Sequence, residues 1–277
     1  MILDLIKSLI YGIVEGITEW LPVSSTGHMI LLNSFLHFNN VSDGFFSMFE
    51  VVIQFGAILA VVALYWRRLW PWRRRDGKIV TRRSTLRLWA KIIAACIPAA
   101  IVGVLFDDKI EELFYHPVPI ALALIIVGIA FILVENHLAD TVPSVTKPSQ
   151  ISFKAALIIG LFQVVAAVFP GTSRSGATII GALLIGIARP AAAEFTFYLS
   201  VPVMLGASLL KLVRFGLGFT GAEAAILIVG MVSAFIVSML IIRFLMAYIR
   251  RHDFKVFGWY RIALGLFVLI AAATFMR

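Results

Sequence analysis

The stretch Y-G-I-V-E-G-I-T-E-W-L-P-V-S-S-T-G-H at residues 11–28 puts a polar turn in the middle of an apolar segment that runs from Ile2 to Phe38. Pro22 ends the first helix of this segment, because proline lacks the backbone N–H that a helix interior requires. Apolar residues resume after His28, so the chain can turn back inside a bilayer. We therefore predict a re-entrant hairpin of two half-helices.

A second segment of this kind covers residues 153–188, and its polar turn reads F-P-G-T-S-R-S-G-A-T at residues 169–178. A shift of 148 positions pairs Gly12 with Gly160, Glu15 with Gln163, Pro22 with Pro170, Ser24 with Thr172 and Ser25 with Ser173. An odd number of predicted spans separates the two segments, so related halves would have opposite orientations in the membrane. We predict a single domain over residues 1–277, with repeat halves 1–150 and 151–277.

The composition requires a bilayer. Hydrophobic residues make up 61% of the 277 positions and charged residues 14%, whereas about a quarter of an average soluble domain is charged. Six further runs have the length of a full crossing: residues 48–66, 88–106, 117–135, 194–214, 222–246 and 256–276. The predicted fold class is an all-α integral membrane protein with six transmembrane helices and two re-entrant broken-helix hairpins in an inverted repeat.

The formal net charge of +9 comes from basic residues beside the spans, a distribution that argues against a nucleic-acid partner. Ten Lys and Arg residues lie between Arg67 and Lys91, and the positive-inside rule places this connection in the cytoplasm. Lys211 and Arg214 then fall on the outer face as exceptions to the rule. The single cysteine, Cys96, can form neither an intrachain disulfide nor a thiolate metal cluster.

Glu15 and Glu19 are four residues apart, which puts both carboxylates on one helix face. A carboxylate within hydrocarbon is costly, so this pair needs a cation, a proton or a polar cavity. Hard oxygen ligands suit Mg²⁺ or Ca²⁺, and we expect Glu15 and Glu19 as the candidate metal ligands, with no organic cofactor. The structural alternative is a pair that lies near an aqueous surface.

The turn after Pro22 supplies three hydroxyls, a glycine and an imidazole within residues 24–28. Ser25 and His28, next to two carboxylates, contain the parts of an activated nucleophile with its base and acid. The alternative is that a hydroxyl caps the half-helix that starts near Met29, which does not account for His28.

The second turn has the composition of an anion site. The Arg174 guanidinium matches phosphate oxygens, and backbone N–H groups at a helix start, freed by Gly171 and Gly176, add positive potential. The structural alternative is that Arg174 pairs with Glu15 or Glu19 across the interface of the two halves. Glu50, Gln54 and Glu194 at the starts of two spans either line the same cavity or have a structural role as a helix cap or an interface contact.

The motifs E-G-I-T-E-W-L-P-V-S-S-T-G-H and P-G-T-S-R-S-G-A-T resemble those of the bacterial undecaprenyl-diphosphate phosphatase family, which is associated with bacitracin resistance. The likeness continues through F-E-V-V-I-Q-F-G-A-I-L-A-V-V at residues 49–62 and covers essentially the whole chain. It implies a C55 isoprenyl diphosphate substrate, a site on the outer face of the bacterial inner membrane, recycling of the lipid carrier for peptidoglycan synthesis, and bacitracin as a competitor for the substrate. Membrane lipids and a homodimer complete the expected partners.

The family's motif residues fall on Glu15, Glu19, Ser25 and His28 in the first turn, and on Ser173, Arg174 and Ser175 in the second. The predicted catalytic residues are Glu15, Glu19, Ser25, His28 and Arg174. The predicted substrate-binding residues are Ser24, Thr26, Gly27, Gly171, Thr172, Ser173, Ser175, Thr178 and Gln54.

Three nucleophiles stay open at this point, because Ser25, His28 and a water molecule would use the same residues. A lipid flippase or transporter is the main rival function, since inverted repeats of broken helices also serve alternating access. A type-2 phosphatidic acid phosphatase is disfavoured, because the distal catalytic histidine of that class is absent: the next histidine after Arg174 is His252, beside a basic loop.

Overall fold

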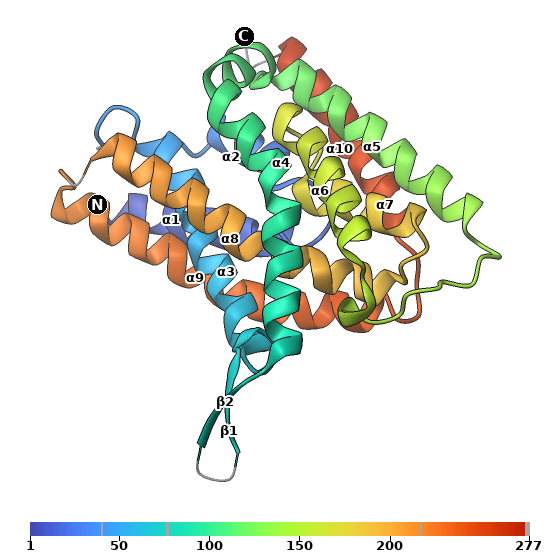
Figure 1. Ribbon diagram of the computed structural model, residues 1–277. Coiled ribbons are helices and arrows are strands. Elements are labelled where there is room, and N and C mark those ends of the chain that lie inside the picture. The colour runs from blue at the N-terminus through green and yellow to red at the C-terminus, as the bar shows by residue number, and fades with distance from the viewer. Residues whose placement is uncertain (40, 76–77, 217, 275–277) are drawn as a thin grey trace.

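The computed structural model describes residues 1–39, 41–75, 78–216 and 218–274. Its elements are α1 (Ile2–Thr18), α2 (Ser25–Asn33), α3 (Phe45–Leu69), β1 (Trp72–Arg75), β2 (Lys78–Thr81), α4 (Arg83–Phe114), α5 (Pro117–His137), the short 3₁₀ helix η1 (Pro148–Gln150), α6 (Phe153–Val168), α7 (Arg174–Leu184), α8 (Arg189–Phe215), α9 (Gly221–Tyr248) and α10 (Lys255–Thr274). Figure 1 shows them as a helical bundle with one β hairpin at an end.

Six helices are long and apolar enough to cross a membrane: α3, α4 over Arg83–Phe106, α5, α8, α9 and α10. Each coincides with one of the six predicted spans, which confirms the all-α membrane class. The last span was predicted to residue 276, and its final two residues lie outside the described part of the chain. Large apolar side chains such as Ile101, Ile126 and Leu133 are exposed on these helices, as expected for surfaces that face lipid.

The arginine-rich connection contains a β hairpin that hydrophobic patterning did not predict. Strands β1 and β2 pair antiparallel, with Trp72 opposite Thr81 and Arg75 opposite Lys78. The hairpin projects from one end of the bundle, between α3 and α4 (Figure 1). Its basic residues therefore mark that end of the molecule.

The helices pack in pairs that are exchanged between the two halves of the chain. Helix α1 packs against α9 and α6 packs against α4, while α3 packs against α8 and α5 against α10. Small residues allow the exchanged pairs to approach closely. A Cβ atom on Gly12 would lie 2.4 Å from the Gly230 carbonyl of α9, and one on Gly160 would lie 2.3 Å from the Ala95 carbonyl of α4. The 148-residue shift therefore describes the first helix of each hairpin.

The same shift is wrong by one residue in the turns. Ser24 and Ser173 are the N-caps of α2 and α7, and their side chains accept hydrogen bonds from the backbone N–H groups of Gly27 and Gly176. These two serines also share a positive φ. Ser24 thus corresponds to Ser173 and Ser25 to Arg174, because the second turn is one residue longer. The boundary of the halves near residue 150 stays a prediction.

Candidate active site

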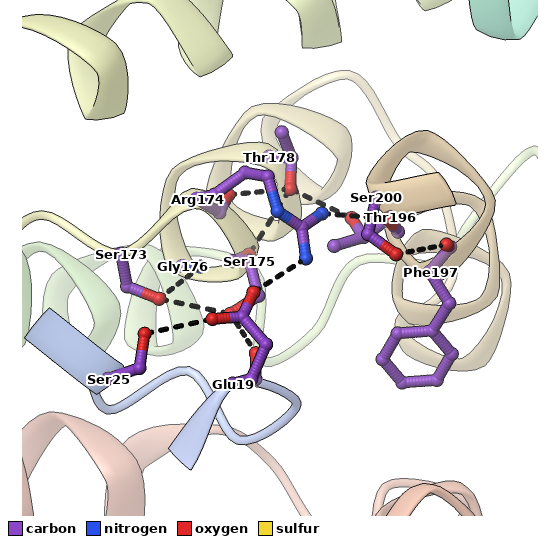
Figure 2. Close-up of polar contacts among 10 residues, drawn as sticks. All are labelled: Glu19, Ser25, Ser173, Arg174, Ser175, Gly176, Thr178, Thr196, Phe197 and Ser200. Atoms are coloured by element: carbon purple, nitrogen blue, oxygen red, sulfur yellow. Dashed lines mark hydrogen bonds and ion pairs between the residues drawn. The ribbon is translucent and has the colours of Figure 1, made fainter. Parts of the chain in front are cut away.

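Glu19 lies where the two polar turns meet, between Ser25 of one hairpin and Arg174 of the other (Figure 2). The Ser25 hydroxyl donates to Oε2 of Glu19 at 2.8 Å, and Nη2 of Arg174 donates to Oε1 at 3.0 Å. The Glu19 and Arg174 side chains are only 7% and 12% exposed. The structural alternative, in which Arg174 pairs with one of the two glutamates, thus holds for Glu19. A carboxylate held in this way keeps one oxygen against the serine proton.

The N-caps of α2 and α7 are strained. Ser24 has φ 73° and Ser173 has φ 67°. Residues other than glycine adopt positive φ at a cost of about 1–3 kcal/mol, and they do so mainly at functional sites. Each cap side chain satisfies only the third amide of its helix. Among the described residues, no acceptor faces the first N–H groups of both helices, at residues 25–26 and 174–175, as is usual at a helix start. Two helix N-termini with free donors therefore lie beside Glu19, an arrangement suited to a phosphate group.

A cavity of about 350 Å³ opens next to this cluster. Glu15, Ser25 and Thr26 line one wall of it, and Glu50 and Gln54 of α3 lie on another. The predicted positions of Ser25, Thr26 and Gln54 at a cavity therefore agree with the structure. Both hairpins reach it, because Pro170 of the second turn is also part of the lining.

Glu15 is the least satisfied group of the site. Its side chain is 0% exposed, and neither carboxylate oxygen has a hydrogen-bond partner among the described residues. Such a group requires a cation or a proton. Glu19, in contrast, accepts one hydrogen bond at each oxygen, from Ser25 and from Arg174, and the Glu15–Glu19 metal pair stays a prediction. The described residues contain no group of three or more His, Cys, Asp or Glu side chains placed to hold a metal ion.

Three further polar residues of the cavity were not predicted: Lys211, Glu111 and Tyr115. Lys211 Nζ lies 3.7 Å from Glu111 Oε2, and the Tyr115 hydroxyl donates to Oε1 of Glu50 at 2.9 Å. Burial, and then the Glu50 carboxylate, raise the pKa of the Tyr115 phenol above its ordinary value, so the phenol stays a donor. Lys211 had one sequence signal, since it broke the positive-inside rule.

His28 does not face Ser25. Its Nδ1 lies 2.7 Å from the Ser24 carbonyl oxygen and its Nε2 lies 2.7 Å from the hydroxyl of Tyr260 on α10. The imidazole also stacks on the Tyr260 ring. Both ring nitrogens thus contact groups other than the serine. Of the two residues expected to move the Ser25 proton, Glu19 is the one that contacts Ser25 in this structure, and the catalytic part of His28 stays a prediction.

The other predicted binding residues contact the backbone and side chains around the two turns. Ser175 donates to the Glu19 carbonyl at 3.2 Å, and Thr178 is fully buried between the Arg174 carbonyl and Thr196. A Cβ at Gly27 would lie 3.0 Å from the Leu124 side chain. Gly171 and Thr172 turn their carbonyls away from the cavity, toward α10.

Glu194 lies at a different place from the cavity. It accepts hydrogen bonds from Arg68 and from Tyr198, near the end of the bundle that carries the β hairpin. The alternative of a structural contact therefore holds for Glu194, while Glu50 and Gln54 do line the cavity.

The fold and site define a class: a polytopic helical membrane protein with a buried polar cluster built from two broken hairpins. A profile of the family described as bacitracin resistance protein BacA matches residues 8–267, and the chain belongs to this family. It is 57% identical over 268 residues to undecaprenyl-diphosphatase 1 of Clostridium acetobutylicum, and this alignment covers 97% of each chain. It is 56% identical to the undecaprenyl-diphosphatase of Acetivibrio thermocellus over 97% of each chain, and 53% identical to that of Enterococcus faecalis over 98% of each.

Proposed function

We propose that this protein hydrolyses undecaprenyl diphosphate to undecaprenyl phosphate and inorganic phosphate, and so recycles the lipid carrier of peptidoglycan synthesis. The named activity of its full-length relatives supports this proposal. The observation that carries it is the chain of hydrogen bonds from Ser25 through Glu19 to Arg174 at the edge of a polar cavity. A carrier needs only a binding site, whereas a hydroxyl held against a carboxylate is the arrangement of a nucleophile and its base.

The proposed reaction has two steps. Glu19 takes the Ser25 proton as the serine oxygen attacks the terminal phosphorus, and the bond from phosphorus to the bridging oxygen breaks. Undecaprenyl phosphate leaves with that oxygen, and Ser25 carries the phosphoryl group. Glu19 passes its proton to the departing undecaprenyl phosphate and is a carboxylate again. A water molecule then gives a proton to Glu19 as its oxygen attacks the same phosphorus. The bond from phosphorus to the Ser25 oxygen breaks and Glu19 returns the proton to that oxygen, which releases inorganic phosphate and restores Ser25. The contacts of His28 disfavour a phosphohistidine, and they give His28 the part of holding the α2 cap.

Positive groups stabilise the charge of the transferred phosphoryl group in this scheme. Nε of Arg174 is buried and has no acceptor among the described residues, so one donor is available to a phosphate oxygen. The free N–H groups at the start of α2 and α7 add further donors. Lys211, which also lines the cavity, would contact the second phosphate, which stays with the lipid.

A divalent cation fits one part of this site. Glu15 offers a buried carboxylate without a partner, and Glu50 and Gln54 supply oxygen atoms on the same cavity. We propose that Glu15 holds Mg²⁺ or Ca²⁺ there, with phosphate oxygens and water as the remaining ligands. The cation would neutralise charge on the diphosphate.

The proposed location is the bacterial inner membrane, with the cavity open to the outer face. The cavity is lined by the N-terminal part of α3 and the C-terminal parts of α4 and α8, whereas the basic hairpin lies at the opposite ends of α3 and α4. The positive-inside rule puts the hairpin in the cytoplasm. An outward site would let bacitracin compete for the substrate, and a homodimer remains our proposal for the assembly.

Phosphate release from undecaprenyl diphosphate by detergent-purified protein tests the proposal. We expect release by the wild type, loss in Ser25→Ala and Arg174→Ala, and a decrease when a chelator is added. Ser84→Ala is the control, because Ser84 is exposed at the start of α4 and does not line this cavity. If folded wild-type protein releases no phosphate with any metal, the hydrolase proposal fails and lipid transport becomes the leading hypothesis.

A further inference from the structure

Arg261 is a fully buried arginine in the middle of α10, with 0% of its surface exposed. No carboxylate among the described residues pairs with it. Its partners are three backbone carbonyls: Nη1 donates to Pro22 at 3.2 Å, and Nη2 donates to Gly171 and to Thr172 at 2.8 Å each. Burying a guanidinium without a counter-charge is costly, and such groups within membrane segments serve function by default.

These carbonyls belong to the two turns of the candidate active site. Pro22 lies two residues before the N-cap of α2, and Thr172 lies one residue before the N-cap of α7. The two turns are about half the chain apart in sequence and come from different hairpins. One rigid guanidinium fork therefore fixes the position of one turn relative to the other.

The same contacts fix the backbone of the second turn. Ser173 has φ 67°, a strained conformation that persists only when its surroundings impose it, and Gly171 has φ 92°, which glycine adopts without strain. In a trans peptide the carbonyl and the following N–H point in opposite directions. The bond from Arg261 to the Thr172 carbonyl thus turns the Ser173 N–H away from Arg261.

The neighbouring residue strengthens this link. Tyr260 contacts the first hairpin through Nε2 of His28, so consecutive residues of α10 hold both turns. Neither Tyr260 nor Arg261 lines the cavity, and within the described part of the chain Arg261 donates hydrogen bonds only to the backbone of the turns.

We propose that Arg261 is a positioning residue that aligns the two hairpins, so that Glu19 of the first turn meets Arg174 of the second. The expected effect on kcat rests on the proposed phosphatase function. The alignment of the two hairpins does not. Lysine cannot replace arginine here, because a single ammonium group lacks the fork that reaches carbonyls on both sides. Arg261→Lys therefore keeps the charge and loses the alignment.

The test uses full-length protein in detergent and compares Arg261→Lys, Arg261→Gln, Glu19→Gln and the double variant Arg261→Lys/Glu19→Gln. Arg243→Lys on α9 is the matched control, because Arg243 is exposed. We expect Arg261→Lys to lower kcat at least about tenfold with little change in KM, as misplacement of catalytic groups does. If Glu19 and Arg174 no longer meet in Arg261→Lys, adding Glu19→Gln will lower its Tm less than it lowers that of the wild type.

Full kcat in Arg261→Lys, or Tm losses that simply add in the double variant, would overturn the proposal. The Tm comparison does not depend on catalysis. If the wild type releases no phosphate, the proposed function fails, and the non-additivity of Tm still decides whether Arg261 aligns the turns. Arg261→Lys retains the charge, so it keeps the test open if Arg261→Gln does not fold.

Discussion

Glu19 is the residue that joins the two hairpins chemically, because one oxygen contacts Ser25 and the other contacts Arg174. A carboxylate in this position has two separable tasks. It orients Arg174, and it accepts a proton from Ser25. The amide of glutamine keeps the size of the side chain and removes the proton acceptor, so it separates the second task from packing.

We expect Glu19→Gln to lower kcat by about 10²–10⁴-fold, the range for loss of a general base. Phosphate release from undecaprenyl diphosphate measures it. Glu112→Gln is the control, since Glu112 is exposed on α4. A Glu19→Gln variant with more than half of the wild-type kcat would show that the Ser25 proton leaves by another route.

Lys211 lines the same cavity as Ser25 but comes from α8 and lies near Glu111. A lysine that binds the lipid-side phosphate contributes about 1.5–3 kcal/mol through a charge-assisted hydrogen bond. Loss of this energy in Lys211→Gln should raise KM roughly 10–100-fold, since about 1.4 kcal/mol corresponds to a factor of ten. We expect kcat to change much less. Lys211→Arg should retain most of the affinity. Steady-state kinetics on both variants decide this, and an unchanged KM in Lys211→Gln would remove Lys211 from the binding site.

Several site residues could be predicted from the sequence because ionisable groups are rare in apolar segments. Glu15, Glu19 and Arg174 stand out for that reason, and Ser25 follows from its place in the turn. Lys211 and Arg261 could not be predicted, since each reaches the site from a helix far away in sequence. The contacts of the His28 ring with Ser24 and Tyr260 could not be predicted either, because spacing from Ser25 does not reveal them.

At the scale of elements, close helix packing depends on positions without a side chain. Gly160 of α6 faces the Ala95 carbonyl of α4, where an added Cβ would lie 2.3 Å away. That contact is with backbone, so one helix must move. We expect Gly160→Ala to destabilise the protein by about 1–3 kcal/mol, the usual cost of overpacking, and to lower Tm by several degrees in detergent.

Gly103→Ala in α4 is the matched control for Gly160→Ala. An added Cβ at Gly103 meets nothing within 4 Å, and alanine favours a helix over glycine. We therefore expect Gly103→Ala to leave Tm unchanged or slightly higher. Equal Tm losses in both variants would mean that α4 and α6 do not pack as described.

The spans were predictable because length and hydropathy decide whether a helix crosses a bilayer. The turns were predictable from Pro, Gly and hydroxyl residues. The β hairpin escaped prediction, since Trp72–Arg75 is a run of interfacial and basic residues without an alternating pattern. The one-residue offset between the turns also escaped, because it depends on the backbone conformation of Ser24 and Ser173.

At the scale of the whole molecule, the basic hairpin and the cavity lie at opposite ends of α3 and α4. The orientation of the protein in the membrane therefore decides from which side the substrate's diphosphate enters. Positive charge beside the spans favours the cytoplasm for the hairpin. The cavity end should then face outward.

Labelling of single cysteines tests this orientation in intact cells. In a Cys96→Ala background, a membrane-impermeant thiol reagent should label Glu112→Cys at the cavity end, and should label Arg73→Cys in the hairpin only after permeabilisation. Both residues are exposed, so access to the reagent depends on the side of the membrane. The unsubstituted protein is the control, because Cys96 is buried. The reverse labelling pattern would place the cavity in the cytoplasm, and the diphosphate would then have to reach Ser25 from inside the cell.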